Sequence, residues 1–362
     1  MTARPLSIGP TLVLAVGVGA ALYALYSSNK RKNDKTEGND DPVVARIDEL
    51  IVYPIKSASG VRVDECELTW KGLKYDRSYS IVVPVVEESD QSPSPHTAQY
   101  RALSQAKTPR MSLIHPALPN AQGITIEFIE SGEKPSSIHV PLLMNGRRIT
   151  IVLWGNTAVG IDQGDEAAQW LSDHLDIPGT RLLKAVDDEE LTRYLAAAQN
   201  RPDAHHLDYH YIRPLDVLSR ASVAQVVAHV PVEVGRRMDH RRFRANIILD
   251  GCSPFTEDKY STLEFQDNSL LKIDLDRLCD RCVIPSVDPD TGIKDTETNE
   301  PFPTLLSYRR GKTIMNSCHP RHRQFLAEHS KLPFLGVHAT PRFAEGASSR
   351  QVVRVGDVVR FV

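Results

Sequence analysis

Short apolar stretches rich in β-branched residues recur along most of this chain, and they do not alternate regularly with helices. Within them Val, Ile and Thr alternate with polar residues, and clusters of Gly, Pro and Asp lie between them, which is typical of strands joined by turns. A doubly wound parallel sheet requires strands that alternate with helices. We therefore predict a β-rich α+β fold, with strands at residues 46–52, 61–69, 78–83, 124–129 and 149–153, and again at 245–249, 269–275, 351–354 and 357–362.

Two segments have the apolar periodicity of α-helices. Residues 165–175 place apolar side chains at helical spacing, with Asp165 as the expected N-cap and Pro178-Gly179 beyond the end. Residues 219–229 begin with Ser219, whose hydroxyl can cap the first turn. The side chains expected to face inward are Ala167, Trp170, Leu171 and Leu175 in the first helix, and Val223, Val226 and Val227 in the second.

The N-terminal segment has the composition of a membrane anchor. Residues 5–29 contain no charged side chain, and residues 12–26 are almost wholly apolar or small. This length suffices for a helix across a bilayer, which takes roughly 20 residues, and the basic residues that follow favour a cytosolic position for the rest of the chain. A cleaved secretory signal is the alternative, but its apolar core is normally shorter and follows stronger positive charge. We predict that residues 1–42 form an N-terminal transmembrane helix and a polar tether.

Charge and cysteine content narrow the classes of function. The net charge of the 362 residues is −3, whereas a nucleic-acid-binding protein needs a basic surface, so we expect no nucleic-acid partner. The five cysteines are an odd number and are widely scattered, which does not fit a secreted disulfide framework. A reducing compartment with functional thiols fits better.

Two cysteines lie three positions apart in the segment Cys279-Asp280-Arg281-Cys282, and the sequence Asp288-Pro289-Asp290-Thr291-Gly292 follows closely. A guanidinium beside a thiol favours the thiolate, which binds soft metals or attacks electrophiles. The Pro and Gly of the second segment fix a tight turn. These residues therefore predict a reactive or metal-bound cysteine on well-defined backbone.

Other interpretations of the cysteines and histidines remain open. Cys279 and Cys282, together with a second Cys/His pair, have the ligand types of a four-ligand zinc site. That second pair, Cys318 and His322, lies in a polar, basic stretch. A redox Cys-x-x-Cys pair would need a βαβ context, which is missing here. We expect the histidines of the Pro/Asp-rich stretch to lie in a solvated loop and not at a metal: His205, His206 and His210.

Several motifs occur in the order found in the MOSC-domain proteins, the family to which the mitochondrial amidoxime-reducing components belong. The strongest is Cys-x-Arg-Cys followed by Val-Asp-Pro-Asp-Thr-Gly, and the resemblance extends from about Val44 to the end of the chain. The other matching segments are Tyr53-Pro54-Ile55-Lys56-Ser57, Tyr75-Asp76-Arg77, Arg242-Phe243-Arg244-Ala245-Asn246-Ile247-Ile248 with Gly251-Cys252, Leu306-Ser307-Tyr308-Arg309 and Val355-Gly356-Asp357-Val358-Val359.

The resemblance implies two domains after the anchor. Residues 43–185 would form the MOSC N-terminal β-rich domain, and residues 186–362 the MOSC β-barrel-like domain. A boundary near residues 180–210 fits the irregular Pro/His/Asp-rich stretch there.

The resemblance also implies a molybdenum–pterin cofactor (Mo-molybdopterin) and the residues that hold it. Cys282 would be the metal ligand and catalytic residue, whereas Cys279 would be a neighbour. Arg281 would stabilise the thiolate and donate to the cofactor. We expect Lys56 and Ser57 to be exposed by a turn after a strand. The remaining predicted cofactor contacts are Arg77, which precedes a strand, and Arg244 and Asn246, which we expect to alternate along one strand and to face one pocket.

Two segments depart from the family pattern. The family carries small hydroxyl residues ahead of a proline, but here Tyr211, Ile212 and Arg213 precede Pro214. Either Arg213 replaces a hydroxyl contact with a charged one, or the loop runs differently. The segment at residues 100–105 also resembles the family only loosely. Both segments would shape the entrance for substrate.

The function that the resemblance implies is the molybdenum-dependent reduction of small N-hydroxylated or N-oxygenated compounds such as amidoximes and hydroxylamines. No flavin or haem motif is visible, so electrons would come from outside, from NADH through cytochrome b5 reductase and cytochrome b5. The implied location is the mitochondrial outer membrane, with a single pass and the catalytic domain facing the cytosol. The alternative is a non-catalytic molybdenum-cofactor or sulfur carrier of the same family. We expect no pyridoxal-phosphate desulfurase domain of the kind that cofactor sulfurases carry.

Overall fold

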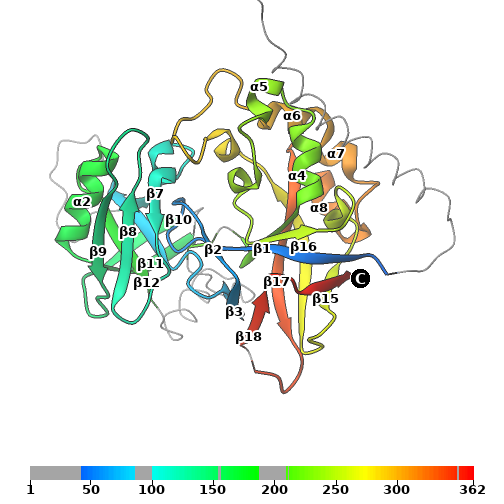
Figure 1. Ribbon diagram of the computed structural model, residues 1–362, viewed down its shortest axis with the longest axis horizontal. Coiled ribbons are helices and arrows are strands. Elements are labelled where there is room, and N and C mark those ends of the chain that lie inside the picture. The colour runs from blue at the N-terminus through cyan, green and yellow to red at the C-terminus, as the bar shows by residue number, and fades with distance from the viewer. Residues whose placement is uncertain (1–41, 86–99, 154–155, 187–208, 211, 349) are drawn as a thin grey trace, which may run out of the picture. The chain divides into compact units, whose positions relative to one another are not determined.

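The computed structural model describes residues 42–85, 100–153, 156–186, 209–210, 212–348 and 350–362. Residues 43–362 form one compact unit (Figure 1). The predicted anchor and tether, His205 and His206 lie outside the described residues. Across the ranges described, no helix combines the length and apolar character needed to cross a bilayer.

The larger of two barrels is built mainly from the C-terminal half of the chain. Its eight-stranded sheet runs in the order β14-β13-β17-β16-β15-β19-β1-β2, and an additional pairing of β14 with β1 closes it. In β1, Leu50 pairs with Ile247 on one side and Ala45 with Val359 on the other. The strands are β1 (Val44–Val52), β2 (Val61–Val63), β13 (Leu215–Ser219), β14 (Ile247–Asp250), β15 (Thr262–Phe265), β16 (Leu271–Asp280), β17 (Phe334–Phe343) and β19 (Val358–Phe361).

Alternation of apolar and polar residues explains the core of this barrel. In β16, Leu271, Ile273 and Leu275 are buried and the residues between them are only partly buried, as expected where successive side chains point to opposite faces of a strand. These side chains pack with Ile47 and Leu50 of β1 in one hydrophobic cluster. The first strand of the described chain therefore completes a barrel whose other strands, apart from β2, come from the second half.

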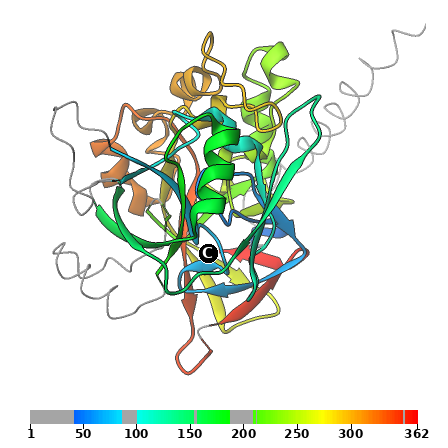
Figure 2. The same cartoon turned by 90° about the vertical axis from the view of Figure 1, so that its left-hand side faces the viewer.

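The smaller barrel is closed by the strands β10-β11-β12-β5-β6. A three-stranded sheet, β7-β8-β9, lies beside it, and both pack against α2 (Asp165–Leu175) in a shared cluster (Figure 2). Another three-stranded sheet has the order β18-β3-β4. The bounds are β3 (Glu65–Thr69), β4 (Gly72–Leu73), β5 (Tyr79–Pro84), β6 (Tyr100–Ala102), β7 (Ile114–Pro116), β8 (Gly123–Phe128), β9 (Ser136–Pro141), β10 (Arg148–Leu153), β11 (Asn156–Asp162), β12 (Arg181–Ala185) and β18 (Gln351–Arg354).

Both predicted helices form. The bounds of α2 match the prediction, but Gly164 is its N-cap and Asp165 lies in the first turn, where a carboxylate still favours the helix dipole. Ser219 caps α4 (Arg220–Val227), and its Oγ accepts a hydrogen bond from the Ser222 amide at 3.1 Å. The shorter helices are η1 (Pro109–Leu113), α5 (Val232–Gly235), η2 (His240–Phe243), η3 (Thr256–Asp258), η4 (Ile284–Ser286), α6 (Phe302–Tyr308), α7 (Gly311–Ile314), η5 (Pro320–His322) and α8 (Arg323–Glu328).

The predicted β-rich fold is confirmed, with differences at some strand ends. The predicted strand at 61–69 is divided into β2 and β3, and the strand predicted at 245–249 begins only at Ile247. The strand predicted at 269–275 begins at Leu271 and extends to Asp280, because its pairing with β17 continues through two register shifts, between Leu275 and Arg277 and between Leu278 and Asp280. This extension brings the first cysteine of the Cys-x-x-Cys motif to the end of a sheet.

Candidate functional site

A pocket of about 290 Å³ brings together every residue that the sequence predicted as a cofactor contact. These residues come from segments far apart in the chain: the loop after β1, the turn before β5, the segment between η2 and β14, and the end of β16. Cys282 is exposed in this pocket. The predicted residues in its lining are Lys56, Ser57, Arg77, Arg244, Asn246, Arg281 and Cys282.

Six lysine and arginine side chains and two aspartates line this pocket, and the pKa values of two of the cations, Lys56 and Arg244, are lowered. Desolvation lowers the pKa of Lys56 to about 8, and Arg244 and Arg77 add electrostatic repulsion. Desolvation likewise lowers the pKa of Arg244 to about 10. Among the described residues Arg244 has no carboxylate partner; its Nη1 donates to the carbonyl of Ala58 at 2.6 Å. An anionic ligand would offset this effect, because a nearby negative charge favours the charged forms of lysine and arginine.

Arg77 is held by a buried carboxylate. Its Nη1 donates to Asp76 Oδ2, and its Nη2 donates to the carbonyl of Arg244 at 3.1 Å. His210 Nε2 lies 2.9 Å from the same Asp76 oxygen, and the Tyr53 amide donates to Oδ1 at 2.7 Å. Burial opposes ionisation of Asp76, but Arg77 and His210 outweigh it and hold the pKa of this carboxyl below its usual range. The prediction that His210 lies in a solvated loop is wrong, since it is buried.

Backbone geometry at the site is unusual. Ser57, Arg77 and Arg244 have positive φ angles of 66°, 49° and 59°, a left-handed conformation that costs free energy in residues other than glycine. Such conformations cluster at functional sites, where the surrounding structure imposes them. The predicted turn at Lys56 and Ser57 exists, but it does not expose both residues, because Ser57 is only 6% exposed.

Arg244 and Asn246 do not alternate along a strand as predicted, since Arg244 ends η2 and both residues precede β14. Arg244 still reaches the pocket. The Asn246 side chain is used within the barrel: its Nδ2 donates to the carbonyl of Ile51 at 3.0 Å, and its Oδ1 accepts from the Asp216 amide at 3.2 Å. Asn246 therefore links β1, which contains Ile51, to β13, which contains Asp216, and it lines the pocket.

Arg281 also has a structural role that the sequence did not indicate. Its guanidinium donates to the carbonyls of Leu335 and Phe243 at 2.7 and 2.8 Å, and to Asp216 Oδ2 at 2.9 Å. The predicted stabilisation of the Cys282 thiolate by Arg281 stays a prediction, and these structural contacts are additional to it. These contacts fix the backbone on which Cys282 is presented.

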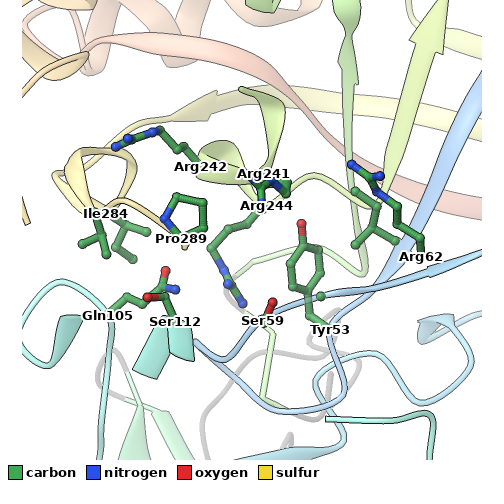
Figure 3. A pocket seen from close by; sticks show the side chains of 13 residues that line it. Tyr53, Ser59, Arg62, Gln105, Ser112, Arg241, Arg242, Arg244, Ile284 and Pro289 are labelled. Carbon is green, nitrogen blue, oxygen red and sulfur yellow. The ribbon is translucent and has the colours of Figure 1, made fainter. Parts of the chain in front are cut away.

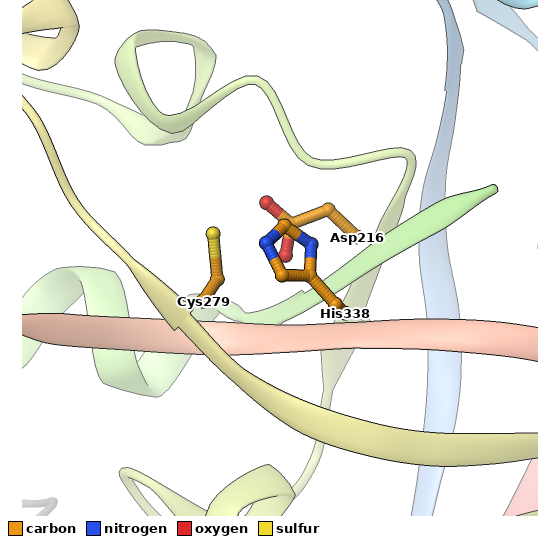
Figure 4. Close-up of side chains that lie close together, drawn as sticks. All are labelled: Asp216, Cys279 and His338. Atoms are coloured by element: carbon orange, nitrogen blue, oxygen red, sulfur yellow. The ribbon is translucent and has the colours of Figure 1, made fainter. Parts of the chain in front are cut away.

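Cys279 lies at the pocket floor beside two further polar side chains. Ligand atoms of Cys279, Asp216 and His338 lie within 4.8 Å of one another, and the three side chains point toward one another (Figure 4). Burial raises the pKa of Cys279 well above its usual value. Burial, and to a smaller extent the charge of Arg281, lowers the pKa of His338 well below its usual value. Because the Asp216 carboxylate already binds Arg281, we assign no metal to this group.

The zinc alternative is not supported by the described residues. Cys318 is buried in the hydrophobic core of the larger barrel, and neither it nor His322 joins Cys282 in a cluster of three potential metal ligands anywhere in the described ranges. All five cysteines are free, so Cys279 and Cys282 are not joined by a disulfide. Cys282 is therefore the accessible thiol of the pair.

Sequence reasoning missed three residues of the pocket lining, Asp216, His210 and His338, and also Asp76, which binds Arg77 and His210 from outside the lining. Asp216 and His338 stand in otherwise apolar strands, and a charged or imidazole side chain within an apolar strand needs a partner when buried. That signal was visible in the sequence. The departure at Arg213 is partly explained, because this residue lines the pocket and its Nε donates to Asp276 at 2.8 Å.

Comparison with known proteins fits this geometry. The pattern of the MOSC N-terminal beta barrel domain matches residues 44–178, and the pattern of the MOSC domain matches residues 204–360. The chain belongs to the MOSC-domain family. The matched ranges leave out residues 179–203, and the boundary proposed between residues 185 and 186 lies in that interval.

Relatives of this MOSC-domain protein carry two kinds of name. Mitochondrial amidoxime reducing component 2 of Rattus norvegicus is 29% identical over 294 residues, which cover 81% of this chain and 80% of the relative. Mitochondrial amidoxime-reducing component 1 of Mus musculus is 28% identical over 318 residues, covering 87% and 82%. Molybdenum cofactor sulfurase of Drosophila willistoni is 27% identical over 273 residues, covering 74% of this chain but 30% of the relative.

The residues of this MOSC-domain pocket fit a phosphorylated metal chelate. An exposed thiol, Cys282, is a ligand for a soft metal. Lys56, Arg77 and Arg244 supply the positive charge that a phosphate requires. Desolvation is the main cause of the lowered pKa values of Lys56 and Arg244, and a bound anion would oppose it.

Proposed function

We propose that this protein is a molybdenum-cofactor-dependent oxidoreductase that reduces small N-hydroxylated or N-oxygenated compounds. The observation that carries the proposal is the single pocket in which the exposed thiol of Cys282 meets the cations Lys56, Arg77 and Arg244. The names of the relatives, amidoxime reducing component and molybdenum cofactor sulfurase, support a molybdenum-related function.

Each pocket residue has a defined task in this proposal. The Cys282 sulfur would be the protein ligand of the molybdenum–pterin cofactor, which supplies two-electron chemistry when bound. Lys56, Ser57, Arg77 and Arg244 would hold the phosphate and pterin edges. Arg281 and Asn246 keep the neighbouring segments in place through their backbone hydrogen bonds, so that the thiol and the cations keep a fixed separation.

We further propose an external electron supply and a membrane location. Electrons would come from NADH through cytochrome b5 reductase and cytochrome b5. The apolar N-terminal segment, residues 5–29, would anchor the chain in the mitochondrial outer membrane with residues 43–362 facing the cytosol. The word mitochondrial in the relatives' names supports this location. Anchoring would raise the local concentration of membrane-bound partners.

The proposal is tested by metal analysis and turnover of the purified full chain. We expect stoichiometric molybdenum and NADH-dependent reduction of an amidoxime when cytochrome b5 and its reductase are present. Lys56→Met should lose most of the molybdenum, whereas Lys259→Met, at an exposed lysine outside the pocket lining, should retain it. Bound cofactor without turnover of any N-hydroxylated substrate would favour the carrier alternative. Absence of molybdenum would refute both functions.

A further inference from the structure

A second, smaller pocket adjoins the first. It has a volume of about 50 Å³ and shares Arg242, Arg244 and Ile284 with the lining of the larger pocket. One water molecule needs only about 10–15 Å³, so the space can hold a small polyatomic ligand. Figure 3 shows Arg244 extending into this space, with Ser59 on one side of its guanidinium group and Ser112 and Gln105 on the other.

Two polar side chains in this pocket can donate hydrogen bonds to a ligand. Ser112 is 1% exposed, and its Oγ has no hydrogen-bond partner in the described part of the chain. Gln105 is 5% exposed and lines the same pocket. A buried polar group without a partner costs free energy, so the Ser112 hydroxyl favours a ligand that accepts a hydrogen bond, and the Gln105 amide can donate a second one. Their position opposite Arg244 makes an anion the best such ligand.

Other charges around this pocket are already neutralised by the protein. Arg62 Nε lies 2.7 Å from Glu49, and Arg242 Nη2 lies 2.9 Å from Asp288. Arg241 binds two carboxylates, Asp239 and Asp290. Among the arginines that line this pocket, Arg244 is the one that forms no ion pair with a carboxylate of the described residues. The positive charge without an ion-pair partner in this pocket therefore belongs to Arg244, which shares the lining with the hydrogen-bond donors Gln105 and Ser112.

We propose that this second pocket binds a small tetrahedral oxyanion of the phosphate type through Arg244, Gln105 and Ser112. Two sources share this chemistry: inorganic phosphate, and the terminal phosphate of the cofactor. The second source rests on the proposed function, whereas the first does not. Gln105 and Ser112 lie outside the larger pocket, so their contribution can be separated from that of Lys56.

The test is calorimetric titration of inorganic phosphate into full-length protein prepared without and with cofactor. Loss of one charge-assisted hydrogen bond weakens binding by about tenfold, and we expect this from Ser112→Ala and from Gln105→Met in the cofactor-free protein. Gln122→Met, at an exposed glutamine, should leave that component of binding unchanged. Thermal melting checks that each variant is folded.

The cofactor-loaded protein identifies the source of the anion. If loading abolishes the component that depends on Gln105, the cofactor's own phosphate occupies the pocket; if the component persists, the ligand is free phosphate. Either result supports an oxyanion site. Phosphate binding that neither Ser112→Ala nor Gln105→Met weakens, or no binding at all to the cofactor-free protein, overturns it. Molybdenum content measured in parallel tests the proposed function independently.

Discussion

The guanidinium carbon of Arg244 lies 4.4 Å from the centroid of the Tyr53 ring. Arg77 lies at the same distance from that ring. An aromatic face attracts a cation without cancelling its charge. Tyr53 therefore holds two guanidinium groups at the pocket while leaving their positive charge available to a ligand.

Replacing the ring should destabilise the fold more than removing its hydroxyl. The Tyr53 hydroxyl donates only a long hydrogen bond of 3.4 Å to the carbonyl of Ala245, so Tyr53→Phe should lower the free energy of unfolding by less than about 1 kcal/mol. Tyr53→Leu loses both cation–π contacts and part of the packing, and should cost about 3 kcal/mol. Urea denaturation measures both; equal losses would mean that the ring face does not support the arginines.

The two cysteines should separate metal binding from packing. Cys282→Ala should abolish molybdenum retention and turnover, yet change the free energy of unfolding by no more than about 0.5 kcal/mol, because the side chain is exposed. Cys279→Ala should retain molybdenum and lower the free energy of unfolding by about 1–2 kcal/mol, because it is buried. Metal analysis measures molybdenum retention, and urea denaturation measures the free energy of unfolding of each variant. Equal loss of metal from both variants would mean that the pair acts jointly.

Asp76 should support the pocket in a pH-dependent manner. Asp76→Asn leaves Arg77 and His210 without their carboxylate and should cost about 3–5 kcal/mol at pH 7. The pKa of Asp76 is lowered in the folded protein, so its contribution is present above the ordinary value near 3.8 and is lost as pH falls through the lowered one. The difference in unfolding free energy from wild type should shrink below pH 4. A difference that stays constant to pH 2, or one matched by the exposed control Asp267→Asn, would contradict this.

Glu257 should show the opposite dependence of stability on pH. It is buried next to the Ser219 cap of α4, where burial and the neighbouring Asp258 raise its pKa from 4.5 to about 7. The protonated acid is favoured in the fold, so stability falls as pH rises from 4.5 through 7, by about 3 kcal/mol in total. Glu257→Gln should be more stable than wild type at pH 8 and nearly equal at pH 5 in urea denaturation. The exposed control Glu233→Gln should show no such pH dependence.

Removal of the N-terminal segment should leave the folded unit intact. Residues 43–362 form a compact unit by themselves, so a chain that begins at Asp41 should be soluble and should melt within a few degrees of the full-length protein in detergent. Molybdenum retention should be unchanged. Aggregation of the shortened chain would indicate that the apolar segment packs on the folded unit.

Much of the site could be predicted from sequence because its motifs occur in the same order as in the MOSC-domain family. Lys56, Arg77, Arg244 and Cys282 all reach one pocket, as their ordered motifs indicated. The local patterns also gave the exact bounds of α2 and β18. Periodicity and turn chemistry depend on residues close together in the sequence, so they can be recognised without the tertiary structure.

The remaining features depend on contacts between distant segments. Nothing in the sequence near Arg281 indicates that Asp216 binds it 65 positions away. The burial of His210 depends on Asp76, 134 positions earlier. The positive φ angles of Ser57 and Arg244 arise because the folded pocket imposes them on residues that do not prefer them. Pairings of this kind are decided by topology and not by local composition.

The pairing of β1 with both β14 and β19 has a consequence for biosynthesis. A ribosome releases residues 44–52 long before their hydrogen-bonding partners at residues 358–361. Until β19 is released, an apolar strand with an open edge is exposed, and such edges pair readily with other chains. Nascent chains stalled before β19 should therefore bind chaperones and resist compaction, and release of β19 should permit barrel closure.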